Sequence, residues 1–265
     1  MEIKQYILAQ SLQQAYELNQ KKGNRILGGT LWLRLGSTPI STAIDLSALG
    51  LDTVEETEDQ FSIGAMATLR QLETHPGLNA YTQGAAAKAV EPIVGVQFRN
   101  LATVGGSIFG RFGFSDVLTL FLALDTQVEL YHAGTVPLEQ FVSMKPDRDI
   151  LVRLTVKKRP GDFTFLSMRN SRTDFPVLTC ALSRMDGEYR AVYGARPARA
   201  MVLRDEESIL SGGITPDSAR AFARYAADHV PTGSNTRGSA AYRTHLIEVL
   251  TRRGLLELGG THYGD

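Results

Sequence analysis

The chain has 265 residues, enough for one large domain or two modest ones with a proper hydrophobic core. Its 28 basic and 28 acidic side chains cancel, so no overall charge attracts nucleic acid or an anionic membrane. The content of 43% hydrophobic residues is ordinary for a globular protein. Because the chain has one cysteine, it cannot form an internal disulfide, a CxxC zinc site or an iron-sulfur cluster of its own.

The first part of the chain mixes helices and strands. Residues 1–18 are too polar for a signal peptide and no apolar run is long enough to span a membrane, so we expect a cytoplasmic protein that binds no membrane. Ser11 is the predicted N-cap of a helix over 11–22. Strands are predicted at 25–27, 42–49 and 60–66, followed by a helix from Thr68, which forms a capping box with Gln71. Next come a small-residue helix at 79–90, an apolar strand that turns on two glycines at 100–109, a helix at 115–125 and a strand at 127–132.

From about residue 149 the pattern changes to consecutive strands. Four runs, at 150–158, 163–168, 177–185 and 188–194, predict an antiparallel sheet. Asp186-Gly187 between the last two is a strong hairpin signal. Two amphipathic helices follow, with one apolar stripe through Phe222 and another through Leu246. We therefore predict an α+β fold with domains at 1–150 and 151–265.

Metal-binding residues are sparse. The histidines stand at positions 75, 132, 229, 245 and 262, without a metal-ligand spacing. Cys180 lies in an alternating strand, where a buried, inert thiol is the default interpretation. We therefore expect no metal site.

Two glycine pairs are the most informative segments. Ile26-Leu27-Gly28-Gly29-Thr30 and Ala102-Thr103-Val104-Gly105-Gly106-Ser107 each place Gly-Gly and a hydroxyl residue after an apolar run. Glycine lets consecutive backbone N–H groups converge on an anion, so two facing loops could hold the pyrophosphate of a dinucleotide. Taken alone, each pair fits a plain tight turn better, because Gly-Gly is common among 25 glycines. The GxGxxG, GxxxxGK[ST] and GxSxG motifs are absent, which excludes their standard sites.

These segments also resemble a known family. Arg25–Trp32, the run Val96–Ile108 with its Arg-Asn-x-Ala-Thr-Val-Gly-Gly core, and Ser115-Asp116 are similar to the FAD-binding medium subunit of molybdenum hydroxylases of the xanthine dehydrogenase and carbon monoxide dehydrogenase type. Ile63–Thr68 and Tyr242–Leu246 extend the resemblance over nearly the whole chain.

The resemblance implies a fold and a cofactor site. The fold is a two-part FAD-binding domain of the p-cresol methylhydroxylase and vanillyl-alcohol oxidase type, followed by a smaller domain of antiparallel sheet and helices. FAD is bound noncovalently, because neither loop carries a histidine. The implied cofactor-binding residues are Ile26, Leu27, Gly28, Gly29, Thr30, Leu31, Trp32, Ile93, Thr103, Val104, Gly105, Gly106, Ser107, Asp116 and Leu151.

Several of these residues also fit a purely structural role. Asp116 is implied to contact the sugar-phosphate region of FAD, but it also fits a helix cap or a first-turn acid. Ile93, Leu151 and Trp32 fit core packing. Ser107 stands where the family usually has asparagine, and Ser167-Met168 stand where many members carry a lysine near the flavin. Arg169, Arg172 and Asp174 follow in a segment that approaches the flavin in the family, and they fit a solvated hairpin loop equally well.

The implied activity is electron transfer. FAD receives electrons from iron-sulfur clusters of a partner subunit and passes them to NAD or another acceptor, while a molybdopterin-binding large subunit oxidises the substrate. No side chain of this chain is expected to be catalytic, because the cofactor does the chemistry. The alternatives are a stand-alone FAD-dependent reductase, which needs an acid/base set that the C-terminal half lacks, and a flavin-free assembly scaffold of the same fold.

Overall fold

The computed structural model describes residues 2–260, so His262 lies outside the described residues. The chain forms two compact units built from interleaved segments. The first comprises Met1–Leu72, Gly95–Gly110 and Thr126–Lys157, and the second comprises Glu73–Val94, Arg111–Asp125 and Lys158–Asp265. The chain passes from one unit to the other five times. The last passage, after Lys157, is near the expected domain boundary at residue 150. A division into 1–150 and 151–265 stays a prediction.

A small parallel sheet opens the first unit. Its strands are β1 (Ile3–Leu8), β3 (Ile40–Asp45) and β2 (Arg25–Leu27), in the order β1-β3-β2. The helix α1 (Leu12–Asn19) begins after Ser11, whose side chain accepts a hydrogen bond from the Gln14 amide, as predicted. Ala15 of α1 packs with Ile44 of β3 in one buried cluster. No prediction from the sequence covers β1.

An antiparallel sheet completes the first unit. Its strands run in the order β4 (Val54–Glu56), β5 (Gln60–Gly64), β8 (Leu151–Lys157), β6 (Thr126–Leu130) and β7 (Gly134–Pro137). The helix α6 (Val104–Phe109) contacts β5 and β8, and α8 (Leu138–Ser143) contacts β6 and β7. The remaining short elements of this unit are the 3-10 helices η1 (Leu33–Leu35) and η2 (Ser47–Leu49) and the helix α5 (Val96–Arg99).

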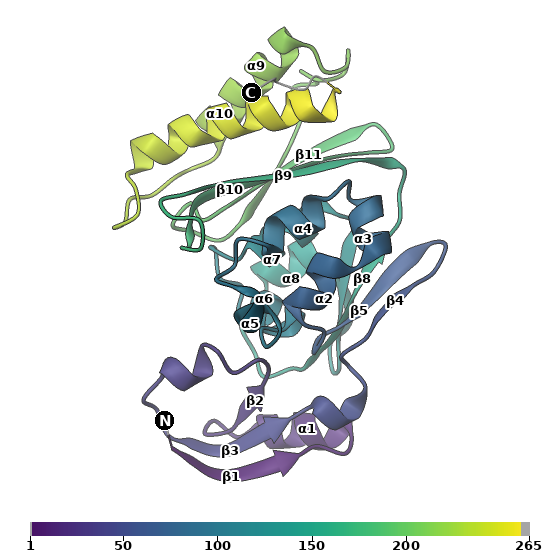
Figure 1. Cartoon of the computed structure of the whole chain (residues 1–265), viewed down its shortest axis with the longest axis vertical. Coiled ribbons are helices and arrows are strands. Elements are labelled where there is room, and N and C mark those ends of the chain that lie inside the picture. The colour runs from purple at the N-terminus through teal and green to yellow at the C-terminus, as the bar shows by residue number, and fades with distance from the viewer. Residues whose placement is uncertain (1, 261–265) are drawn as a thin grey trace. The chain divides into compact units, whose positions relative to one another are not determined.

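The second unit is a sheet with helices on both faces (Figure 1). The sheet is antiparallel in the order β12 (Met201–Arg204), β11 (Glu188–Gly194), β10 (Pro176–Met185) and β9 (Gly161–Arg169). On one face lie α4 (Ala85–Val90) and α7 (Asp116–Ala123), and on the other lie α9 (Pro216–His229) and α10 (Ala240–Leu258). β10 alternates accordingly: Thr179 bonds Thr119 of α7, whereas Cys180 packs in the core formed with α10.

Most predicted elements are confirmed. The capping box of Thr68 and Gln71 starts α2 (Leu69–Thr74), with reciprocal hydrogen bonds to both backbone amides. Asp186 and Gly187 both have positive φ, at 48° and 86°, which suits the predicted tight hairpin.

Three predictions were wrong. The helix over 79–90 is two helices, α3 (Pro76–Tyr81) and α4, because Gln83 and Gly84 adopt left-handed conformations. The run 100–109 is not a strand turning on glycines, since its glycines lie inside α6. The run 150–158 forms β8 in the first unit, and β12 instead completes the sheet of the second.

Neither a membrane span nor a metal cluster is found among residues 2–260. No helix in this range is both long and apolar enough to cross a bilayer. No three of its His, Cys, Asp or Glu side chains group as ligands for a metal ion.

A buried arginine joins three segments of the second unit. Arg243 of α10 is fully buried, and its Nε donates to the carbonyl oxygens of Val177, at 2.9 Å, and Ala195, at 3.1 Å. Its Nη1 donates to the carbonyls of Gly233 and Gly238, at 2.7 and 2.5 Å, and its Nη2 donates to Asn235 Oδ1 at 2.7 Å. One guanidinium therefore ties α10 to β10, to the segment after β11 and to residues 233–238.

We expect Arg243→Met to lower the free energy of unfolding by about 3 kcal/mol, because it leaves several buried oxygen acceptors without a hydrogen-bond donor. Urea unfolding followed by circular dichroism measures this change. Arg253→Met, at an exposed position of the same helix, is the matched control and should change stability by less than about 0.5 kcal/mol. Equal stability of the two variants would show that the buried network contributes nothing.

Candidate cofactor site

A cavity of about 510 Å³ lies within the first unit, a size typical of ligand pockets. Its wall is formed by the end of β2 with the turn after it, by the start of α6, and by the segment that leads into β8. The residues that line it are Asn19, Asn24, Arg25, Ile26, Gly28, Leu46, Ala65, Met66, Thr103, Gly105, Gly106, Phe109, Gly110 and 146–151. Both glycine pairs therefore contribute to one cavity.

The first glycine segment has unused backbone donors. Within residues 2–260, the amides of Gly28, Gly29, Thr30 and Leu31 donate to no protein acceptor. Thr30 has a left-handed φ of 59°, which turns the chain sharply after the glycines. Consecutive amides in such a turn form a concave set of donors that suits an anion.

The two segments are in direct contact. A Cβ at Gly29 would overlap the carbonyl of Leu101, and a Cβ at Gly28 would lie 2.9 Å from Thr103 Oγ1. Only glycine permits this approach, so the first pair is more than a plain turn.

The second glycine segment differs from the sequence expectation. Its amides are already bonded: Val104 to the Ala67 carbonyl at 2.8 Å, Gly105 to the Ala65 carbonyl at 2.7 Å and Gly106 to Thr103 Oγ1 at 3.2 Å. The Ser107 amide likewise donates to Thr103 O at 3.1 Å. The expectation that both loops offer free amides therefore applies to the first loop alone.

The two glycines of the second pair have separate roles. A Cβ at Gly105 would come within 2.7 Å of the Ala65 carbonyl, so this glycine allows α6 to pack on the chain leaving β5. A Cβ at Gly106 would meet only Thr103 Oγ1, at 3.1 Å, and Gly106 is exposed on the cavity wall. Gly106 is thus the position where a side chain would fill the cavity.

Sequence reasoning missed the residues that fix the opposite wall. The Arg148 guanidinium donates to the carbonyls of Asn19, Lys21 and Lys22 at 2.7 to 3.0 Å, and Asn19 Nδ2 donates back to the Arg148 carbonyl at 2.8 Å. These bonds hold the segment before β2 against the segment before β8. No motif marks them, because the partners are at least 126 residues apart.

The other predicted site residues are divided between the units. In the first unit, Leu31 and Val104 are buried, Trp32 is half exposed, and Leu151 is buried at the cavity. Ile93 and Asp116 belong to the second unit.

Asp116 is a buried first-turn acid. Ser115 is the N-cap of α7, and its Oγ accepts from the Leu118 amide at 3.1 Å. Asp116 Oδ1 instead accepts from Arg169 Nη2 at 2.5 Å. Burial raises the pKa of Asp116, Arg169 lowers it, and the result is about 6.

Cys180 is buried and unreactive. Burial raises the pKa of its thiol to about 12, so almost no thiolate forms near neutral pH. This property agrees with the expectation of an inert thiol.

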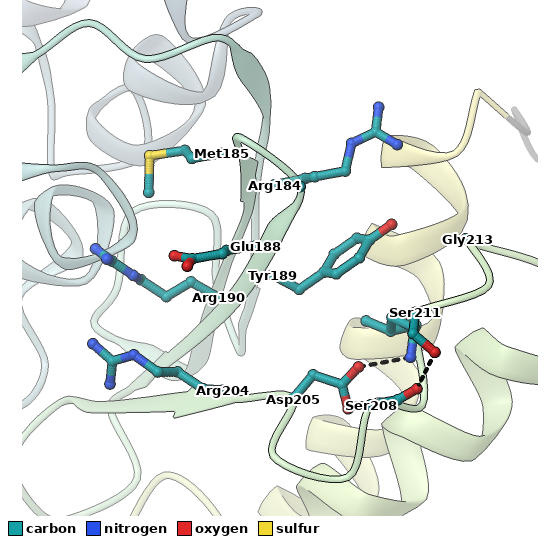
Figure 2. Close-up of a pocket in the computed structure, with 12 residues that line it drawn as sticks. Arg184, Met185, Glu188, Tyr189, Arg190, Arg204, Asp205, Ser208, Ser211 and Gly213 are labelled. Atoms are coloured by element: carbon teal, nitrogen blue, oxygen red, sulfur yellow. Dashed lines mark hydrogen bonds between the residues drawn. The ribbon is translucent and has the colours of Figure 1, made fainter.

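A second cavity, of about 600 Å³, lies in the second unit beside the β10–β11 hairpin (Figure 2). Its polar side chains do not converge: Glu188 and Arg190 point to one side of the strands, and Arg184 and Tyr189 point to the other. The Asp205 carboxylate is occupied by the amides of the following turn, at 2.8 and 2.6 Å. We assign no ligand to this cavity.

Comparison with known proteins identifies two family domains. Residues 1–156 match the FAD binding domain in molybdopterin dehydrogenase, and residues 163–258 match the CO dehydrogenase flavoprotein C-terminal domain. An uncharacterized protein YgfM of Escherichia coli K12 is 26% identical over 94% of this chain and 93% of its own length. The nicotine 6-hydroxylase medium subunit of Paenarthrobacter nicotinovorans is 26% identical over 83% of this chain and 82% of its own.

Solved structures share the fold. A chain of the carbon monoxide dehydrogenase of Hydrogenophaga pseudoflava superposes with a TM-score of 0.85 at 23% identity, over 97% of this chain and 96% of that one. A chain of quinoline 2-oxidoreductase from Pseudomonas putida 86 gives 0.84 at 20% identity, over 99% of both. The expected FAD-binding part with a smaller antiparallel-sheet domain is therefore confirmed as the fold.

The family matches also confirm FAD as the cofactor and oxidoreductases as the enzyme class. Because the first family model covers more than half of the chain, this protein belongs to the family of FAD-binding domains of molybdopterin dehydrogenases, and it carries their CO dehydrogenase flavoprotein C-terminal domain.

Proposed function

We propose that this chain is the electron-transfer subunit of a molybdenum hydroxylase complex. When FAD is bound, it would supply the redox chemistry that connects the one-electron iron-sulfur clusters of a partner subunit with NAD or another acceptor. A molybdopterin-binding large subunit oxidises the substrate. This chain binds and orients the cofactor and supplies no catalytic side chain.

The observation that carries the proposal is the row of unused amides at Gly28–Leu31, which begins at the cavity wall with Gly28. A pyrophosphate needs several hydrogen-bond donors, and backbone amides supply them without a basic patch. Gly106 leaves the facing wall open, so this donor set and this space fit the pyrophosphate of FAD. The chain's neutral net charge is compatible with this mode of binding.

The other implied contacts are part of the proposal. Ile26, Leu27, Thr103, Ser107 and Leu151 belong to the first unit, and we include them in the proposed site. Three of them, Ile26, Thr103 and Leu151, line the cavity. On the family resemblance alone, we include Asp116, which would accept a hydrogen bond from a hydroxyl of FAD, and Ile93 and Trp32, which would supply apolar contact.

The partner subunits follow from the chain's own chemistry. A relay that accepts electrons from iron-sulfur clusters needs cluster ligands, and Cys180 is the sole cysteine and is buried. The clusters therefore belong to another subunit. The related nicotine 6-hydroxylase chain is named a medium subunit, which is compatible with this division. The cytoplasmic location stays a prediction from the sequence.

We expect the full-length purified chain to show a flavin absorbance spectrum, or to gain one when it is titrated with FAD. Acid extraction and chromatography should identify FAD at about one per chain, released without proteolysis because the link is noncovalent. A chain that stays colourless in excess FAD would contradict the proposal and favour the flavin-free scaffold.

We expect Gly106→Val to raise the FAD dissociation constant by at least about tenfold, because its side chain enters the cavity beside the free amides. Fluorescence titration measures the constant. Gly212→Val is the matched control, since a Cβ there meets nothing within 4 Å and Gly212 does not line the cavity. Equal affinity of the two variants would place the cofactor elsewhere.

We expect affinity purification of the tagged chain from its native cells to bring down iron, acid-labile sulfide and molybdenum in stoichiometric amounts. The isolated chain should contain none of the three. Recovery of a flavoprotein without metals, active alone with a reductant and a small substrate, would favour the stand-alone reductase.

A further inference from the structure

One arginine joins two walls of the cavity in the first unit. Arg148 Nη1 donates to the carbonyls of Asn19 and Lys21 at 2.7 and 3.0 Å, and Nη2 donates to the Lys22 carbonyl at 2.9 Å. In return, the Arg148 carbonyl accepts from the side-chain amides of Asn19, at 2.8 Å, and Gln20, at 3.1 Å. These bonds, the Arg148 clasp, therefore run in both directions between the end of α1 and the segment before β8.

The wall on the β8 side is fixed by its own sheet. The Asp149 carboxylate is buried and accepts from the amides of His132 and Ala133 at 2.9 and 2.8 Å. The Ile150 carbonyl accepts from the Tyr131 amide at 2.9 Å. The segment that carries Arg148 is thus anchored to the turn between β6 and β7.

The wall that leads to the first glycine turn has weaker support. β2 is an edge strand of three residues and pairs with β3 alone. The amides of Gly28–Leu31, directly after it, donate to no protein acceptor within residues 2–260. The turn before β2 is held by the Arg148 clasp and by Arg25 Nη1, which donates to the carbonyls of Lys22 and Asn24 at 2.7 Å. The place of the amide row therefore depends on bonds made before β2, in addition to its contact with the second glycine segment.

Capping of α1 does not by itself explain the clasp. The last carbonyls of a helix lack intrahelical partners, and a cation near them is favourable. Lys21 and Lys22 are exposed beside these carbonyls, so local cations and water could serve this end of the helix. Arg148 adds what a local cap cannot supply, which is a fixed spacing between two segments that both line the cavity.

The first unit has other contacts that keep it folded without the clasp. Ala15 of α1, Ile44 of β3 and Ile150 belong to one buried cluster. The ring of Tyr16 stacks on that of His132, with centres 5.3 Å apart. Loss of Arg148 should therefore loosen the cavity wall and leave the unit folded.

We propose that Arg148 is a positioning residue for the cofactor: by joining two walls of the cavity, it holds the amides of Gly28–Leu31 in place to bind a pyrophosphate. The inference rests on the proposed function, in which FAD occupies this cavity. Arg148 acts through the backbone and does not touch the phosphates. Donors that are already in place bind without paying an ordering cost, so the clasp raises affinity for FAD.

The first test uses the full-length chain without FAD. NMR relaxation gives the order parameters of the backbone amides in the wild type and in Arg148→Met. In the variant, the order parameters of Gly28–Leu31 should fall toward about 0.6, the range of flexible backbone, and those of Val104–Ser107 should not change. Unchanged order parameters at Gly28–Leu31 would show that the clasp does not position the row.

The second test is FAD affinity, measured by fluorescence titration. Arg148→Met should raise the dissociation constant about tenfold. Ser11→Ala is the matched control, because Ser11 caps the other end of α1, accepting from the Gln14 amide at 3.1 Å, and does not line the cavity. It should leave the dissociation constant within about twofold. Equal weakening by both variants would assign the effect to the stability of α1 and contradict the positioning role.

Arg148→Lys separates the clasp from the charge. Lysine keeps the positive charge but lacks the planar fork that spans three carbonyls, so it should bind FAD within about threefold of Arg148→Met. Full recovery of affinity in Arg148→Lys would contradict the positioning role and favour a direct ion pair with the phosphates. Such a pair would also make the wild-type affinity more sensitive to salt than that of Arg148→Met, whereas we expect equal sensitivity. Arg148→Lys also serves for both tests if Arg148→Met fails to fold.

The outcomes distinguish the two proposals. Wild-type protein that binds no FAD would overturn the proposed function, and the order parameters of the FAD-free chain would still report whether Arg148 fixes the row. If the wild type binds FAD and the Arg148 variants bind it equally well, the positioning role is wrong and FAD binding stands.

Discussion

The close contact of two glycine segments is the constraint on which the cofactor site depends. Gly29 lies against the Leu101 carbonyl and Gly105 against the Ala65 carbonyl, distances that no side chain would allow. The amides of the second segment donate hydrogen bonds within the protein that stabilise this packing. The first keeps the amides of Gly28–Leu31 unused. One segment thus builds the wall and the other supplies the donors.

The same division appears in the electrostatics. The first unit offers an anion neutral dipoles, while Arg25 and Arg148, which line the cavity, donate to backbone carbonyls of the protein. The second unit contains the one strongly perturbed carboxyl among the described residues, Asp116, with its fixed arginine.

Local signals in the sequence predicted most of the fold. The Ser11 cap, the capping box at Thr68 and the Asp186-Gly187 turn depend on near neighbours, and all three are confirmed. The wrong predictions concern features that depend on tertiary contacts. The run that became β8 has the alternation of a strand, but its pattern does not say which sheet it joins. The second glycine pair has the sequence pattern of a turn. In the structure, the amides of Val104 and Gly105 donate to the carbonyls of Ala67 and Ala65, and the pair lies at the start of α6.

The glycines of the candidate site could be predicted from the sequence, but the arginines that fix the surrounding segments could not. Gly28 and Gly106 are found by pattern and resemblance, and both line the cavity. Arg148 bonds partners at least 126 residues away, and Arg169 pairs with Asp116, 53 residues away, so no spacing rule could single them out. Their roles follow from the folded structure.

Amide hydrogen exchange, resolved by NMR, tests the central claim most directly. Without FAD, the amides of Gly28–Leu31 should exchange quickly and those of Val104–Ser107 slowly, because only the latter are hydrogen-bonded in the protein. Addition of FAD should slow exchange at Gly28–Leu31 and leave Val104–Ser107 nearly unchanged. Unchanged exchange at Gly28–Leu31 in a chain saturated with FAD would contradict the account.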